Sequence, residues 1–154
     1  MRKFGIIAVL ALMVTALAAV PALAQSGHFV GTPTCTDEGT TFNCTGKVAG
    51  LGGTTFEITS AAQGTATTTC TNPAGNIAPG QTTTINAGGT TGPTETPTNG
   101  QFQFNVTSAT PTAPAGTCPN TKWTPTVTDV AFGDVTLTLL EDGVVSDTIT
   151  VTVS

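Results

Sequence analysis

Hydrophobic and polar residues alternate with a period of two in several segments of the chain. In residues 101–106, Phe102, Phe104 and Val106 fall on one face and three amide side chains fall on the other. Residues 135–139 and 148–153 repeat this pattern with threonine as the polar residue. A period of two is that of a half-buried β-strand, and no amphipathic helical pattern follows residue 24. The chain is therefore expected to fold as an all-β protein.

Further segments have strand-like patterns bounded by Gly, Pro and Asn. They are residues 28–32, 41–49, 54–60, 65–71, 82–86 and 123–130. Short strands at this spacing favour a single immunoglobulin-like two-sheet sandwich, with an irregular barrel as the alternative. The large apolar residues of these strands form the predicted core: Phe42, Val48, Phe56, Ile58, Phe102, Phe104, Trp123, Val127, Val135, Leu137, Ile149 and Val151.

Residues 1–24 have the organisation of a bacterial secretion signal. Arg2 and Lys3 precede a long apolar run, and small residues stand just before Gln25. This pattern predicts cleavage after Ala24 and export of residues 25–154 as one domain. No later segment approaches the roughly 20 apolar residues of a membrane-spanning helix. We therefore expect a secreted protein, extracellular or at the cell surface, with no membrane insertion after signal removal.

The predicted exported segment is acidic but carries few charges. It holds two lysines, Lys47 and Lys122, against nine carboxylates, which gives a net charge of −7. Such a surface repels a phosphate backbone, so nucleic acid is not expected as a partner. Threonine supplies 35 of the 130 residues, and this β-branched residue suits the exposed face of a sheet.

All four cysteines lie in the predicted exported segment, where disulfides are the expected state. Cys35 and Cys44 bracket a short polar turn, so a hairpin would bring them together. We therefore predict bridges between Cys35 and Cys44 and between Cys70 and Cys118, although four cysteines allow three pairings. Zinc is the alternative, but no Cys-x-x-Cys spacing occurs.

The length of the turn between the last two strands decides which side chains of the two strands share a face of the sheet. A two-residue turn at residues 142–143 pairs side chains from opposite faces. A three-residue turn at residues 141–143 pairs Val135 with Ile149 and is therefore expected. It leaves Asp147 pointing inward, so we also expect a bulge or an exposed sheet edge there.

Groups suited to catalysis are scarce. His28 is the only imidazole, and no Gly-x-Ser-x-Gly motif is present. Three acidic pairs lie near expected loops: Asp37 with Glu38, Asp129 with Asp134, and Glu141 with Asp142. All three pairs are candidates for a weak calcium site and the last two for glycoside hydrolysis, but solvated acidic turns explain the same residues. We predict no enzymatic activity, no cofactor, and no catalytic, cofactor-binding or metal-binding residue.

Without a catalytic centre, the sequence favours a surface, matrix or binding module. Residues 88–100 and 110–116 are rich in Thr, Pro and Gly and are expected to be long surface loops. We expect contacts through these loops and through exposed strand edges, where few charges block pairing. Residues 25–34 are expected to form a mobile arm that adds to a neighbour's sheet. The partner is unspecified, with self-association and an extracellular protein or glycan as the options.

Residues 70–81, together with residues 46–52 and Cys118-Pro119-Asn120 ahead of Trp123, resemble a family of small secreted bacterial proteins of uncharacterised function. That resemblance covers most of the predicted exported chain and implies secretion and an all-β fold. A weaker likeness is to the enediyne-antibiotic carrier apoproteins, which are acidic exported sandwiches with two disulfides. The spacing of Cys35 and Cys44 is near that of one of their bridges, whereas their closely spaced second pair is missing. This likeness implies a small-ligand carrier as an alternative function.

Rows of Thr-x-Thr resemble the faces of some ice-binding proteins, which gives ice binding as a further alternative. The rows are Thr67/Thr69/Thr71, Thr124/Thr126/Thr128, Thr136/Thr138 and Thr148/Thr150/Thr152. They do not repeat at a fixed period, and the β propensity of threonine explains the same residues.

Overall fold

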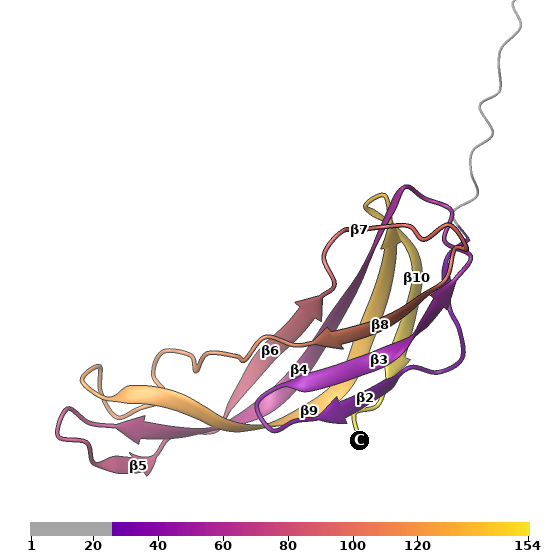
Figure 1. Cartoon of the computed structure of the whole chain (residues 1–154). Helices are drawn as coiled ribbons and strands as arrows, with labels where there is room; N and C mark the ends of the chain where they lie inside the picture. The colour runs from indigo at the N-terminus through magenta and orange to yellow at the C-terminus, as the bar shows by residue number, and fades with distance from the viewer. Residues whose placement is uncertain (1–25) are drawn as a thin grey trace, which may run out of the picture.

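The structure, a computed structural model, describes residues 26–154, which form two β-sheets and no helix (Figure 1). The predicted signal segment lies outside the described residues. The strands are β1 (His28–Phe29), β2 (Thr34–Asp37), β3 (Phe42–Ala49), β4 (Thr55–Thr71), β5 (Ile77–Pro79), β6 (Thr83–Thr90), β7 (Thr94–Glu95), β8 (Phe102–Thr107), β9 (Thr124–Glu141) and β10 (Val144–Val151). The predicted all-β, two-sheet fold is confirmed and is compatible with an immunoglobulin-like sandwich. Within this range, no helix is long and apolar enough to cross a membrane.

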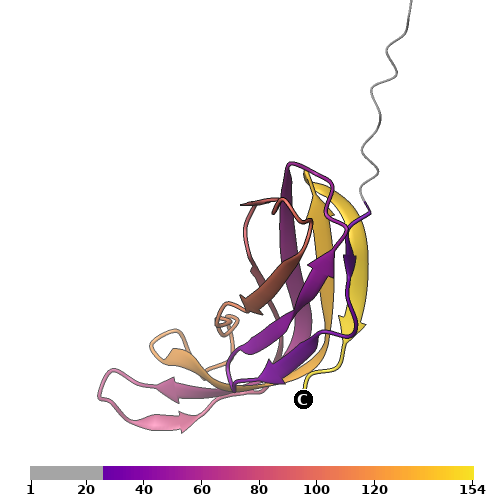
Figure 2. The same ribbon diagram turned by 45° about the vertical axis from the view of Figure 1, so that its right-hand side comes forward.

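Each sheet is built on a central strand or pair of strands. In the four-stranded sheet, β3 pairs antiparallel with β1 and β2 on one side and with β8 on the other. In the six-stranded sheet, β4 and β9 pair antiparallel with each other, and β10 adds to β9. Strands β7, β6 and β5 follow one another along the remaining side of β4. Figure 2 shows the two sheets as separate layers.

Most of the predicted core is confirmed. Eight of its members are buried: Phe42, Val48, Phe56, Ile58, Phe104, Val135, Leu137 and Val151. Phe102, Val127 and Ile149 are partly buried and pack against this cluster. Trp123 does not belong to the cluster, so its prediction as a core residue is wrong.

Strands β4 and β9 run past the end of the sandwich and form an extension that also carries β5 (Figures 1 and 2). We call residues 67–82 and 110–129 the arm. The sequence predicted two strands in place of β4 and two in place of β9, and this division is wrong. Gly64 resembles a turn signal, but it lies where the strands approach closely, since a Cβ there would lie 2.6 Å from Val130 Cγ1.

The hairpin between β9 and β10 turns through two residues, so the predicted three-residue turn is wrong. Asp142 and Gly143 have φ angles of 49° and 80°, which suit the two central positions of a type I′ turn. A register shift between Val145 and Asp147 then places one extra residue in β10. The bulge expected near Asp147 is therefore present, and it aligns the apolar faces that the two-residue turn alone would mix.

The described part of the N-terminal segment belongs to the sheet. Phe29 is only 8% exposed, and its ring lies 5.8 Å from that of Phe104 in an edge-to-face contact. Its backbone N–H donates to Asp147 Oδ2 at 2.9 Å, and Val30 N–H donates to the Lys47 carbonyl at 2.8 Å. The prediction that the N-terminal segment is mobile is thus wrong for residues 26–34. Burying a phenylalanine ring favours docking of this segment on the chain's own core.

Contacts between the two sheets shorten their free edges. Cys35 forms a parallel bridge with Val153, and Ser154 N–H donates to the Cys35 carbonyl at 3.0 Å. At the opposite side of the sandwich, Ala109 N–H donates to the Gly88 carbonyl at 2.9 Å. The edges of the sandwich are therefore partly closed by the chain itself.

Candidate ligand groove in the arm

A hollow of about 640 Å³ lies in the arm. It is lined by Ala113, Pro114, Ala115, Gly116, Thr117, Cys118, Pro119, Asn120, Thr121, Trp123 and Pro125. A second hollow of about 270 Å³ shares Ala113 and Pro125 with it and is otherwise lined by Thr110, Pro111, Thr112, Thr126 and Val127. We call the two hollows together the arm groove.

The arm groove exists because one sheet of the sandwich continues where the other has ended. Trp123, directly before β9, and Pro125 and Val127 within it follow one another at a period of two, and all three are half-buried. In the sandwich such positions face a second sheet, whereas here they adjoin the irregular loop 110–121. A loop covers less apolar surface than a sheet, so the side chain of Trp123 stays partly accessible.

A disulfide and backbone hydrogen bonds hold the loop in place. Cys70 of β4 is bonded to Cys118, with their Cα atoms 5.7 Å apart, which confirms the predicted pair. The carbonyl of Thr117, next to Cys118, accepts a hydrogen bond from Gln81 N–H at 3.0 Å. The carbonyl of Gln81 in turn accepts a hydrogen bond from the hydroxyl of Thr68 at 2.7 Å. This linkage ties the loop that lines the arm groove to β4 and to Gln81.

Asn120 positions the chain next to Trp123. Its Oδ1 accepts the N–H of Lys122 at 2.9 Å, and its carbonyl accepts the N–H of Trp123 at 3.2 Å. The Asn120 Nδ2, the Thr121 hydroxyl and the Trp123 Nε1 make no hydrogen bond to any residue from 26 to 154. Three groups that can donate a hydrogen bond therefore remain available beside an apolar surface.

No residue that lines the arm groove is charged. The nearest charge in sequence is Lys122, which is exposed and is not among the lining residues. The groove therefore differs from the acidic remainder of the chain and suits an uncharged ligand.

The acidic pair Glu141–Asp142 serves structure. Glu141 is 0% exposed, and its carboxylate accepts backbone hydrogen bonds from Gly27 at 3.0 Å and from Gly52 at 2.7 Å. The hydroxyl of Ser146 lies 2.7 Å from the same carboxylate. Burial by itself raises the pKa of Glu141, but the hydrogen bonds from Ser146, Gly52, Gly27 and Gly53 together hold that pKa below its usual value.

Asp142 is occupied in a similar way. Its Oδ1 accepts the backbone N–H groups of Thr54 and Thr55 at 3.0 and 2.9 Å. The loop before β4 is thus bound to the hairpin by two adjacent carboxylates. Backbone N–H groups and the hydroxyls of Ser146 and Thr55 donate to the pair that the sequence offered for glycoside hydrolysis or calcium binding.

The other acidic candidates are dispersed. Asp129 and Asp134 lie five residues apart on one strand, a separation of about 16 Å at the usual rise, too far for one metal ion. Asp37 accepts the N–H of Gly39, and Glu38 lies within hydrogen-bond reach of the Thr41 hydroxyl. Over residues 26–154, no three His, Cys, Asp or Glu side chains gather where they could hold a metal ion.

His28 is an exposed residue of β1. Its Nδ1 lies 2.9 Å from the carbonyl oxygen of Ser26. That contact is to backbone, so the imidazole is not positioned as the base of a nucleophile in the described structure.

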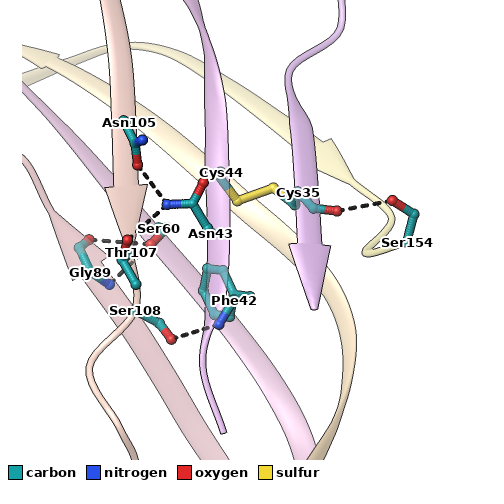
Figure 3. Close-up of a disulfide and its surroundings, with 10 residues drawn as sticks. All are labelled: Cys35, Phe42, Asn43, Cys44, Ser60, Gly89, Asn105, Thr107, Ser108 and Ser154. Carbon is teal, nitrogen blue, oxygen red and sulfur yellow. Dashed lines mark hydrogen bonds between the residues drawn. A yellow bond between two sulfur atoms is a disulfide. The ribbon is translucent and has the colours of Figure 1, made fainter. Parts of the chain in front are cut away.

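The predicted Cys35–Cys44 bridge is also confirmed, and it lies in the sandwich (Figure 3). The two cysteines are direct partners in the pairing of β2 with β3. On the neighbouring strand pair, Asn43 Nδ2 donates to Asn105 Oδ1 and to the Thr107 hydroxyl. This region is a closed network of internal contacts and offers no ligand groove of its own among the hollows described.

Threonines of the predicted Thr-x-Thr rows gather on the outer face of the six-stranded sheet. The pairings align Thr148 of β10, Thr138 of β9, Thr59 of β4 and Thr90 of β6 in one rank across four strands. Thr59 and Thr90 belonged to no predicted row, because cross-strand pairing cannot be read from spacing along one strand. Glu57 borders this rank, and its Oε1 accepts a hydrogen bond from the Thr90 hydroxyl at 2.6 Å.

Comparison with known proteins gives no match, whether with protein-family models, with curated proteins or with solved structures. The class of this protein therefore rests on its own fold and site: an all-β, two-sheet domain with two disulfides and an uncharged groove in an extended arm. The disulfides fit an oxidising, extracellular environment.

Sequence reasoning did not predict the arm groove. Trp123 was assigned to the core, and residues 110–116 were expected to be a surface loop that makes contacts, without Trp123 beside it. The available signal was the period-two series Trp123, Pro125 and Val127 directly after a Pro-rich loop and a cysteine. That pattern indicates that the three side chains share one face of a strand. It does not indicate that the second sheet ends before it reaches them.

Proposed function

We propose that the chain is a secreted, non-catalytic binding module whose ligand site is the arm groove. The observation that carries this proposal is the combination of a partly accessible Trp123 with a loop fixed by the Cys70–Cys118 bridge. A preformed, mostly apolar hollow of several hundred Å³ with a few polar groups is the usual form of a small-ligand site. The partly closed edges of the sandwich favour the loops over strand edges as the contact surface.

A neutral solvatochromic dye, Nile red, tests whether the arm groove accepts a ligand. We expect saturable binding to residues 25–154, with the dye's emission shifted to the blue. The variant Trp123→Ala should weaken binding by about tenfold or more, since aromatic anchors dominate such sites. Thr148→Ala, on the outer face of the distant β10, is the matched control and should bind as the parent does. Equal binding by the parent and Trp123→Ala would overturn the proposal.

The small-ligand carrier suggested by the enediyne-apoprotein likeness is a narrower form of the same proposal, because it requires the same apolar hollow. It differs in requiring slow release. Retention of dye through gel filtration by the parent, lost in Trp123→Ala, would favour a carrier over a module that samples its partner rapidly.

Ice binding is the second candidate, and the rank Thr148, Thr138, Thr59 and Thr90 is the observation that favours it. Against it, sheets twist, and the long strands are visibly curved in Figure 1. Inhibition of ice recrystallisation by the parent, abolished by Thr138→Ala with Thr59→Ala, would support this function. An inactive parent would exclude it.

A further inference from the structure

We propose that the arm groove binds a neutral saccharide, by stacking a sugar ring against Trp123 and bonding its hydroxyls to the groove's free polar groups. This inference rests on the proposed binding function and names its ligand class. The ligand is either a free oligosaccharide or the same sugar within an extracellular polymer, and both present the same chemistry to the groove.

The absence of charged residues from the lining of the arm groove favours an uncharged ligand. A phosphate, a uronic acid or a charged peptide would bring a full charge into the arm groove, where no lining residue carries the opposite charge. Such a group loses hydration without gaining a partner, which disfavours its entry. The lining therefore selects uncharged ligands, in contrast with the acidic sandwich beside it.

Among uncharged ligands, the hydrogen-bond donors that have no partner in the described part of the chain favour a ligand with hydroxyl groups over a purely apolar one. Trp123 Nε1, Asn120 Nδ2 and the Thr121 hydroxyl have no partner among residues 26–154. A purely apolar ligand would cover these groups and leave them unpaired, whereas a saccharide supplies hydroxyl oxygens that accept from them. Sugar rings also have an apolar C–H face, which matches a partly accessible indole ring.

The shape of the arm groove favours more than one sugar unit. Its two hollows, of about 640 and 270 Å³, adjoin at Ala113 and Pro125 and follow the start of β9 from Trp123 to Val127. The larger hollow alone is within the usual volume of a small-ligand site. A short linear oligosaccharide would fill the larger hollow and extend into the smaller.

Trp123 is the only tryptophan of the chain, so its intrinsic fluorescence reports on the site directly. The experiment titrates residues 25–154 with neutral oligosaccharides of glucose, mannose, galactose and N-acetylglucosamine, and repeats each titration calorimetrically. Pull-down with the matching insoluble polysaccharides distinguishes a polymer source from a free sugar. We expect saturable binding of at least one neutral saccharide and none of its sulfated or uronic-acid counterparts.

Variants then locate the binding. Trp123→Ala should weaken saccharide binding by about thirtyfold or more, as loss of an aromatic anchor does. Trp123→Phe keeps an aromatic face but loses the N–H, so it should lie between parent and alanine. Lys122→Ala, beside the groove but outside its lining, should bind as the parent does. Unchanged circular dichroism identifies the variants that remain folded.

The results with the two probes distinguish failure of the saccharide inference from failure of the proposed binding function. Binding of Nile red without binding of any saccharide in the panel overturns the saccharide inference and leaves the proposed function standing. Failure of both probes overturns both. Saccharide binding that Trp123→Ala does not weaken overturns the inference as well, since the sugar would then bind elsewhere.

Discussion

Glu141 shows at the residue scale how far a side chain's role depends on distant parts of the chain. In sequence it is one of two adjacent acids before a glycine, the pattern of a solvated turn. In the fold, Gly27 and Gly52 approach it from segments 114 and 89 residues away and supply backbone donors. A Cβ on Gly27 would lie 2.7 Å from Glu141 Oε2, so a larger residue there would force the carboxylate to shift. No local pattern could have predicted this network.

Replacement Glu141→Gln should destabilise the domain by about 2–4 kcal/mol. The amide of glutamine turns one acceptor into a donor, which then faces backbone N–H groups that need an acceptor. Urea denaturation of parent and variant measures the difference. Glu57→Gln is the matched control, since Glu57 is half-buried and has the Thr90 hydroxyl as partner, and it should cost about 1 kcal/mol or less. Similar losses in the two variants would contradict the structural role of Glu141.

The same carboxylate should make stability depend on pH. The pKa of Glu141 is held below its unfolded value, so its contribution is complete above the unfolded pKa of about 4.3 and declines as pH falls through that value toward the folded pKa. We expect the stability difference between the parent and Glu141→Gln to shrink on acidification through this window. Urea midpoints measured from pH 7 to pH 3 test this, and a constant difference would contradict it.

At the element scale, the strands were predicted better than their connections. The period-two pattern located most strands, yet β4 and β9 were each divided where small residues allow two strands to approach closely. In the last hairpin, the predicted turn length assumed that each residue of β9 pairs with one residue of β10. The bulge between Val145 and Asp147 interrupts this one-to-one pairing. Bulges and strand lengths depend on pairing with distant segments, so the sequence of one strand does not determine them.

The two-residue turn predicts different effects of two substitutions at Gly143. With φ at 80°, Gly143→Ala should destabilise the domain by about 1–2 kcal/mol, because alanine carries a Cβ that this region disfavours. Gly143→Asn should lose less, since asparagine tolerates the left-handed region. Thermal unfolding of the two variants provides the comparison. Equal losses would argue against a positive φ at this position in solution.

The two disulfides should differ in their contribution to stability. Cys70–Cys118 closes a segment of sequence separation 48, and Cys35–Cys44 one of 9, which in the loop-closure model give about 4 and about 2.6 kcal/mol. Removal of each pair by double alanine substitution, followed by urea denaturation, measures both. We also expect faster hydrogen exchange of residues 110–121 only when the arm bridge is absent. Equal exchange of this loop in both variants would show that the bridge does not hold it.

At the scale of the whole molecule, the sandwich and the arm differ in how completely the chain covers its own apolar surface. The sandwich contains the apolar core and the buried Glu141, and its edges are joined by contacts such as that of Cys35 with Val153. The arm has one sheet and a disulfide-fixed loop, and it leaves an uncharged groove at Trp123. Alternation predicted the fold class and the positions of the cysteines predicted both bridges, whereas the groove depends on where one sheet ends.

Amide chemical-shift mapping of residues 25–154, labelled with nitrogen-15 and titrated with Nile red and then with the neutral oligosaccharides, tests the central claim most directly. Our account predicts that the perturbed amides cluster between residues 110 and 127, together with the indole N–H of Trp123. Perturbations centred instead on the outer threonines of β9 and β10, or on the strand edges, would contradict the arm groove as the ligand site.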